Sequence, residues 1–486
     1  MTIRQTARAA PGLLEAFAQA FDPVFPMLNQ REAFRRYVEG LLLPTERNKT
    51  LPGLANSEPV VGAQEGRVQS LQWYLSESSW EAAAVNRRRV ELLKNSPSLA
   101  PHGAGALVID ETGDRKDGHK TAHVGRQYLG NLGKIDNGVV SVTSLWADEQ
   151  VYYPLDVEPY TPASWFAGGP ANAAFRSKLK IAGELVAQAL QAAIPFRAVV
   201  ADNFYGADRT FRKVVDQLGV GYVLALKPSH SWRHGTGTLG SLEEVARAAT
   251  WAGPHQAGAW VAIERAFRDG HTEPWWALEV VAGPFGPQRA ERAVVVTTDP
   301  LSLPELTTWY LVTNLPAPGS PRAATSPLAT ASLVELVRLY GLRTWVEQSY
   351  KQVKHTLGWA QYQVRSDTAI RRHWALVCCA FTFCWWQASH DQETITPLPS
   401  DPATQPTAPQ QKKESNQTRV PTYPGRALCV RSGPGSNPTS CSSAIGTPSR
   451  RCPHPVPCST CLTGCDWAMA SISILRLDHS QQVALH

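Results

Sequence analysis

The stretch GALVIDET, residues 105–112, is a short apolar run that ends in a carboxylate at Asp110. A second stretch, FRAVVADNFYG at residues 196–206, has the same form and carries Asp202 directly after its apolar run. Apolar runs of this length with polar and Gly boundaries are typical of buried strands. We therefore expect Asp110 and Asp202 each to emerge at the end of a strand.

The sequence around these two runs alternates between patterns typical of strands and of helices. Residues 138–160 predict two strands joined by a turn at 147–150, and residues 221–227 predict another strand. Amphipathic helix patterns occupy residues 178–193 and 208–219. This order predicts an α/β fold with a mixed sheet flanked by helices.

Changes in composition and in hydrophobic periodicity divide the chain into five parts. Residues 1–100 predict an N-terminal helical domain with basic clusters that suit DNA, and residues 101–228 and 319–388 predict the two parts of the sheet domain. Residues 229–318 are strand-like and Trp-rich, which predicts a β-rich insertion before the last helix of the site. Residues 389–486 are rich in Pro, Ser, Thr, Arg and Cys, and we predict a disordered C-terminal tail.

Composition limits the class of protein. The chain has 486 residues, 43% of them hydrophobic, which is enough for sizeable cores, and its net charge of +6 mildly favours polyanionic partners. The longest apolar run, residues 374–386, is shorter than the roughly 20 residues that cross a bilayer. The N-terminus lacks the features of a secretory signal. We expect a cytoplasmic protein that does not contact the membrane.

The segment YGLRTWVEQSYKQVKH, residues 340–355, predicts one helix with a polar face. At about 100° per residue, five side chains fall within an arc of about 80°: Tyr340, Arg343, Glu347, Lys351 and Lys354. One interpretation is a solvated face on which Glu347 forms i,i+4 ion pairs. The other is a functional site, in which the carboxylate joins the two aspartates and the cations hold a polyanion.

Asp110, Asp202 and Glu347 come from three separate elements. Clustered carboxylates from separate elements suit hard divalent cations such as Mg²⁺ or Mn²⁺. Two such ions about 4 Å apart can activate a water or a 3′-hydroxyl and stabilise the leaving oxygen of a phosphodiester. Two alternatives stay open: Glu111 and Asp114 are rival ligands, and Asp202 also suits an Asx turn.

The stretch from about 103 to 360 resembles the DDE transposases of bacterial insertion sequences. The signature Tyr-x2-Arg-x3-Glu-x6-Lys of one subgroup is matched by Tyr340, Arg343, Glu347 and Lys354. Residues 108–137 and 199–206 resemble the family's segments around its first and second aspartates. The resemblance implies an RNase H-like catalytic core, with Asp110, Asp202 and Glu347 as catalytic residues and as ligands of two Mg²⁺ or Mn²⁺ ions.

The resemblance also implies the DNA chemistry. Water hydrolyses one strand at each element end, and the freed 3′-hydroxyl attacks target DNA in line. Tyr340, Arg343 and Lys354, with Lys351 beside them, are expected to bind DNA near the cleaved terminus. The partners are the terminal inverted repeats and target DNA, held by a homodimer or larger assembly. In some members of the subgroup a Trp of the insertion stacks on a base flipped from the DNA end, whereas a Trp in such a segment is more often part of the core. The candidates are Trp260, Trp275, Trp276 and Trp309.

The tail leads to the alternative function. Its composition is typical of out-of-frame translation, so we interpret it as the product of a frameshift between residues 390 and 425. In that case this copy is a catalytically inactive remnant that binds element ends without cleaving them. A zinc site and a nuclease unconnected with transposition are weaker readings. The potential zinc ligands are Cys452, His454, Cys458, Cys461 and Cys465.

Overall fold

The computed structural model describes residues 12–44, 48–56, 65–234, 238–268, 270–280 and 291–395. The described residues up to Glu393 belong to one compact unit. No helix within these ranges is long and apolar enough to cross a membrane. The predicted tail, with its potential zinc ligands and its frameshift, lies outside the described residues, except that the last helix continues to Ile395.

Helices and strands alternate along the chain as follows. The α-helices are α1 (Leu14–Gln19), α2 (Leu28–Leu42), α3 (Leu51–Leu54), α4 (Gly66–Ser76), α5 (Ala82–Lys94), α6 (Lys178–Gln191), α7 (Asn203–Gly206), α8 (Arg209–Gln217), α9 (Leu242–Ala248), α10 (Leu333–Gly341), α11 (Thr344–His355) and α12 (Asp367–Ile395). The strands are β1 (Ala106–Arg115), β2 (Gly125–Leu129), β3 (Lys134–Ala147), β4 (Tyr152–Tyr160), β5 (Ala198–Ala201), β6 (Tyr222–Ala225), β7 (Ser231–His234), β8 (Thr238–Ser241), β9 (Val261–Ala266), β10 (Thr272–Val280), β11 (Arg292–Thr297) and β12 (Thr308–Thr313).

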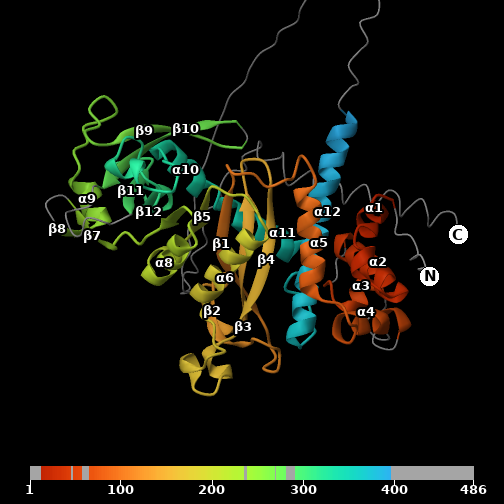
Figure 1. Ribbon diagram of the computed structural model, residues 1–486. Coiled ribbons are helices and arrows are strands. Elements are labelled where there is room, and N and C mark those ends of the chain that lie inside the picture. The colour runs from red at the N-terminus through yellow and green to blue at the C-terminus, as the bar shows by residue number, and fades with distance from the viewer. Residues whose placement is uncertain are drawn as a thin grey trace, which may run out of the picture. The chain divides into compact units, whose positions relative to one another are not determined.

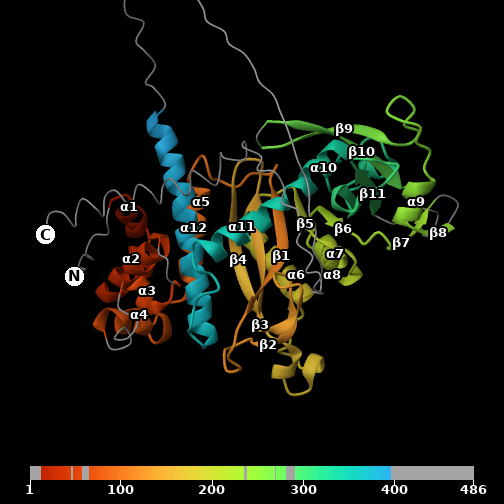
Figure 2. The same cartoon turned by 180° about the vertical axis from the view of Figure 1, so that it is seen from behind.

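One mixed sheet dominates the described residues. Its order is β2-β3-β1-β5-β6-β12-β11-β10-β9, and β4 lies off this path, pairing with residues 140–147 of β3. The pairs β1–β5 and β5–β6 are parallel, whereas the other pairs are antiparallel. Helices lie against both faces (Figures 1 and 2). This arrangement confirms the predicted α/β class and is consistent with an RNase H-like core.

The centre of the sheet is fully buried. Residues 106–109 of β1 and 198–201 of β5 have no exposed surface. A parallel strand that helices cover on both faces needs a continuous apolar run instead of an alternating one. The two runs therefore form central strands, and the aspartate that follows each run lies directly after the paired, fully buried part of the strand.

The strands of the predicted insertion continue the main sheet. β12 pairs with β6 through Leu311–Ala225, Val312–Leu224 and Thr313–Val223, and β11, β10 and β9 follow outward. In Figure 1 these strands lie on the side of the sheet away from α12. The insertion therefore shares backbone hydrogen bonds with the core, while the domain boundaries given above stay a prediction.

Several arginines of the N-terminal basic clusters are buried. Arg35 forms ion pairs with Glu15 at 2.8 Å and Asp22 at 2.7 Å. Arg89 has no exposed surface and donates hydrogen bonds to the carbonyl of Leu155 and the hydroxyl of Thr382. Arg35 thus connects residues within the N-terminal helical segment, and Arg89 connects α5 to β4 and α12. Part of the positive charge that suggested DNA binding is therefore buried and neutralised or hydrogen-bonded within the protein.

Candidate active site

Parallel pairing of β1 and β5 places the two aspartates side by side. The ladder's last pair is Ile109 with Ala201, so Asp110 and Asp202 are the next residues on neighbouring strands. One prediction was wrong here, because Asp110 lies inside β1 and not at its end. The reason is that β3 pairs with β1 through Arg115 on the other side and keeps the strand extended.

Asp202 is held by the turn that follows β5. It is the N-cap of α7, and its Oδ1 accepts a hydrogen bond from the Phe204 backbone N–H at 3.0 Å. At Gly206, a Cβ would lie 1.9 Å from the carbonyl oxygen of Ala225, so only glycine allows this approach to β6. The Asx-turn interpretation is thus confirmed, and the same turn fixes Asp202 beside Asp110.

The segment 340–355 is not one continuous helix, which corrects the prediction. Tyr340 belongs to α10, and the chain makes a tighter turn before α11, with the Arg343 N–H donating to the Tyr340 carbonyl at 3.0 Å. This i→i+3 bond is of the 3₁₀ type, which locally changes the pitch. Glu347 lies in the first turn of α11, and its side chain is 57% exposed.

Arg343 connects two of the predicted metal ligands. Its Nη2 lies 3.2 Å from Oδ2 of Asp110, and its Nη1 lies 3.4 Å from Oε1 of Glu347. Within the part of the chain that the structure describes, no three His, Cys, Asp or Glu side chains are grouped so that they could hold a metal ion. The guanidinium of Arg343 lies between Asp110 and Glu347 and supplies positive charge to both carboxylates.

Burial and charge perturb the proton affinity of this cluster. Burial raises the pKa of Asp110 to about 7; Arg343 opposes the shift, and Asp202 adds to it. Burial also raises the pKa of Tyr340 to about 12. A buried carboxyl whose charge one arginine does not fully offset, next to a second carboxylate, favours an additional cation. The donor type of these side chains, carboxylate oxygen, is the one that a hard divalent ion prefers, although the three carboxylates are not gathered into one ligand group.

The two rival ligands are engaged elsewhere. Glu111 points to the opposite face of the sheet, where its oxygens lie 2.6 Å from Nζ of Lys178 and 2.8 Å from the hydroxyl of Tyr205. Asp114 forms an ion pair with Lys354 at 2.6 Å. Neither carboxylate is therefore available beside Asp110 and Asp202.

The two lysines of α11 differ sharply. Lys351 is exposed and has no ion-pair partner among the described residues. Lys354 has a 13% exposed side chain, which also donates a hydrogen bond to the Gly113 carbonyl at 3.0 Å. The sequence carried a signal for this pair, because Asp114 lies four residues after Asp110 and therefore on the same face of the strand.

The insertion tryptophans pack against one another and against the site. The ring of Trp309 meets that of Tyr340 edge-on at 5.0 Å, and the Arg265 guanidinium lies 4.7 Å from both Trp275 and Trp309. Trp260 and Trp275 are buried, and Trp276 packs on Trp251. All four candidates thus have structural roles, and Trp309 lies nearest the signature tyrosine.

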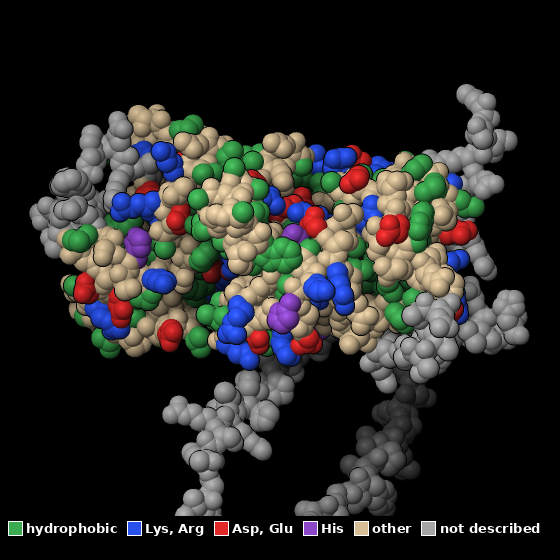
Figure 3. Space-filling model, turned by 90° about the horizontal axis from the view of Figure 1, so that it is seen from below, with side chains coloured by type: hydrophobic (Ala, Val, Ile, Leu, Met, Phe, Trp, Pro, Cys, Tyr) green, Lys and Arg blue, Asp and Glu red, His purple; other side chains and the backbone are tan. Residues whose placement is uncertain are grey.

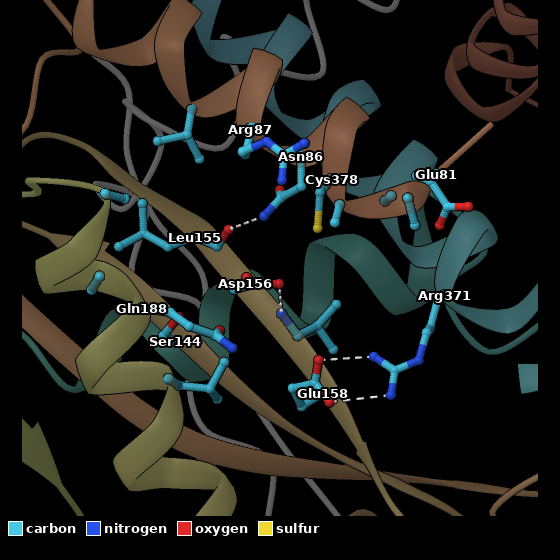
Figure 4. A pocket seen from close by; sticks show the side chains of 18 of the residues that line it. Glu81, Asn86, Arg87, Ser144, Leu155, Asp156, Glu158, Gln188, Arg371 and Cys378 are labelled. Atoms are coloured by element: carbon cyan, nitrogen blue, oxygen red, sulfur yellow. Dashed lines mark hydrogen bonds and ion pairs between the residues drawn. The ribbon is translucent and has the colours of Figure 1, made fainter. Parts of the chain in front are cut away.

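A cavity of about 670 Å³ lies apart from this cluster, between α5, β4, α6 and α12. Figure 4 shows Asn86 reaching the Leu155 carbonyl, and Arg371 paired with Glu158 across its floor. None of the predicted site residues lines it. The cavity therefore lies outside the predicted site.

The fold places Asp110 and Asp202 at adjacent positions on neighbouring strands and Glu347 on a later helix, which is the order of acidic residues expected of a DDE nuclease. A family model described as DDE superfamily endonuclease matches residues 21–267, a range that includes Asp110 and Asp202 and ends before Glu347. The probable transposase for insertion sequence element IS701 of Microchaete diplosiphon is 33% identical over 367 residues, which cover 74% of this chain and 84% of that protein. The chain belongs to the DDE superfamily of endonucleases, as a transposase of an insertion-sequence family.

Proposed function

We propose that this transposase hydrolyses one strand at each end of its insertion sequence and joins the freed 3′-hydroxyl to target DNA. Asp110, Asp202 and Glu347 would hold two Mg²⁺ or Mn²⁺ ions. The observation that carries the proposal is the adjacency of Asp110 and Asp202 at the end of the β1–β5 ladder, with Glu347 connected to Asp110 through Arg343. Bound divalent ions would supply a Lewis acid that activates the attacking oxygen and stabilises the leaving one.

The chain's own cations would position the DNA backbone. Nε of Arg343 is buried and has no hydrogen-bond partner among the described residues, so this donor would meet a phosphate oxygen only after the guanidinium turns outward. Lys351 is exposed on the same helix as Glu347 and suits a neighbouring phosphate. Tyr340 would contribute its hydroxyl, and Lys354 would either join them on DNA or keep its bond to Asp114.

The wider assembly follows from the reaction. Two element ends must be held together, which requires a dimer or larger complex on DNA. In the N-terminal helices, Arg36 and Arg87 are exposed and remain candidates for recognition of the inverted repeats, whereas Arg35 and Arg89 are buried. We expect the complex to act in the cytoplasm, at the nucleoid.

The proposal can be tested with a labelled duplex that carries one element end, incubated with the full-length protein and Mn²⁺. Asp110→Asn, Asp202→Asn and Glu347→Gln should each lower strand nicking by about 10³-fold or more, because each removes a charged metal ligand. The matched control is Glu111→Gln, which neutralises the adjacent carboxylate on the other face of the sheet and should keep nicking within about tenfold of wild type.

Two outcomes would contradict the assignment. Equal losses in Glu111→Gln and Asp110→Asn would show that neutralising any carboxylate of β1 is damaging, so the ligand roles would not stand. The inactive-remnant alternative predicts that wild-type protein binds the duplex with strong salt dependence but never nicks it.

A further inference from the structure

The hairpin of β2 and β3 extends beyond the helices that cover the sheet. Tyr128 and Ile135 lie directly opposite each other on its two strands, and their side chains are 59% and 60% exposed. Leu129, on the other face of the hairpin, is buried. A solvent-facing aromatic and aliphatic pair at matched positions in an otherwise well-packed sheet indicates a surface used for contact.

The exposed pair lies on the same face of the sheet as Asp110. Thr143 is opposite Asp110, and its hydroxyl is hydrogen-bonded to Tyr350 of α11. Since side chains alternate along a strand, Ile135 shares the face of Thr143, and Tyr128 shares the face of Ile135. The face that holds Asp110 therefore continues onto the hairpin; it is covered at Ser141 and Val139, which are buried, and becomes exposed at Ile135 and Tyr128.

Positive charge accompanies this open face. Arg126 is two residues before Tyr128 on the same side, is exposed, and has no ion-pair partner within the described ranges; Lys120 in the preceding loop is likewise exposed. Arg115 and Lys134 are offset by Asp117 and Asp136, with which they form ion pairs. In Figure 3, which views the molecule from below, Lys and Arg side chains lie beside a His, with Asp and Glu side chains among them.

We propose that the open face of the β2–β3 hairpin binds the DNA duplex of the terminal inverted repeat, inward from the scissile phosphate. Because the exposed Lys351 lies on α11 between the site and the hairpin, the hairpin continues the path of the duplex that Lys351 would hold. The inference thus rests on the proposed function. A two-stranded ribbon with an arginine and a tyrosine on its outer face fits a groove of duplex DNA, with the arginine on a phosphate.

The register gives the position of the contact. From Ile135 to Thr143 along β3, at about 3.3 Å per residue, the distance is about 26 Å. At about 3.4 Å per base pair, this places Tyr128 about eight base pairs from the phosphate at Asp110.

The first test measures the binding of full-length protein to a 40-base-pair duplex ending in the element's terminal sequence, without divalent ions, as a function of salt concentration. Arg126→Glu should weaken binding several-fold and lower the slope of log affinity against log salt by about 0.9 or more. The control is Arg209→Glu, an exposed arginine on α8, which packs beside α6 on the opposite face. It makes the same charge change and should leave affinity and slope unchanged. Equal affinities and slopes in Arg126→Glu and wild type would overturn the proposal.

The second test locates the contact by photo-crosslinking after Tyr128→p-benzoylphenylalanine. We expect crosslinks inside the inverted repeat, about eight base pairs from the cleavage position. Crosslinks confined to flanking or target DNA, or to a second protein chain, would overturn the inference. Because neither test requires cleavage, failure here is distinguishable from failure of the metal-ligand assignment, which the nicking assay reports.

Discussion

Lys354 provides the sharpest test of how the signature residues work, because its structural partner competes with its expected role in binding DNA. The perturbation is Lys354→Met, which keeps the length of the side chain but removes its charge. It breaks the 2.6 Å ion pair with Asp114 and the 3.0 Å hydrogen bond to the Gly113 carbonyl. The carboxylate of Asp114, whose side chain is only 5% exposed, would then lose its closest counter-charge.

The structure gives the size of the effect. Removing one partner of a buried ion pair costs about 3–5 kcal/mol, and the partial exposure of Lys354 favours the lower end, about 3 kcal/mol. For a core of this size, that corresponds to a fall in melting temperature of roughly 6 °C. Asp114→Asn combined with Lys354→Met should recover most of this loss, since no uncompensated charge remains.

The assay combines thermal unfolding with DNA binding. Melting temperatures of wild type, both single variants and the double variant form a double-mutant cycle whose coupling energy should be about 2 kcal/mol or more. Salt slopes for binding of the element end should be the same in wild type and Lys354→Met, because the ammonium group faces Asp114. If Lys354→Met left stability unchanged and lowered the salt slope by about 0.9, Lys354 would be a phosphate ligand and our reasoning would be wrong.

Three further predictions concern other parts of the molecule. Burial raises the pKa of Asp156 from its ordinary value of 3.8 to about 6. The folded protein therefore holds this proton more tightly than the unfolded chain, and wild type should lose stability as the pH rises from 3.8 through about 6. The gain in melting temperature from Asp156→Asn should accordingly be larger at pH 8 than at pH 4. Mn²⁺ at about 100 times its dissociation constant should stabilise wild type by about 2.7 kcal/mol, and a melting curve with and without chelator should show no such gain in Asp202→Asn. Trp345→Ala removes a ring stacked on Tyr152 at 4.9 Å and should destabilise the core by about 2 kcal/mol, measured by urea unfolding, whereas Trp345→Phe should keep most of this stability.

The main features of the sheet could be predicted because each of its two central strands appears in the sequence as a short, continuous apolar run. The apolar runs before Asp110 and Asp202 are typical of strands buried on both faces, and their order along the chain implies a mixed sheet. What the runs could not show is pairing between distant strands. β1 continues beyond Asp110 because β3 pairs with it, and the insertion joins the sheet because β12 pairs with β6. Both depend on contacts that no short stretch of sequence contains.

The prediction of a shared helix face for residues 340–355, made at about 100° per residue, was correct only in part. It correctly grouped Arg343 with Glu347, since residues four apart on a helix meet. It missed the tighter turn before Arg343, because an i→i+3 bond in place of i→i+4 leaves no mark in the pattern of apolar residues. It also treated Lys351 and Lys354 alike, although one is exposed and the other is paired with Asp114. The difference comes from the strand packed beneath α11 and not from the helix itself.

The positive charge of Arg343, which lies between Asp110 and Glu347, explains how these acidic side chains can come together before DNA or metal binds. Asp110, Asp202 and Glu347 would repel one another if nothing lay between them, and the pKa of Asp110, raised to about 7, already reflects burial with a nearby carboxylate. Arg343 offsets this repulsion by contacting Asp110 and Glu347 from one guanidinium, and it still keeps one buried N–H unpaired. A phosphate that accepts from this group would draw Arg343 away from the carboxylates, which would then need another cation. Binding of DNA and binding of divalent ions are therefore expected to favour each other at this site.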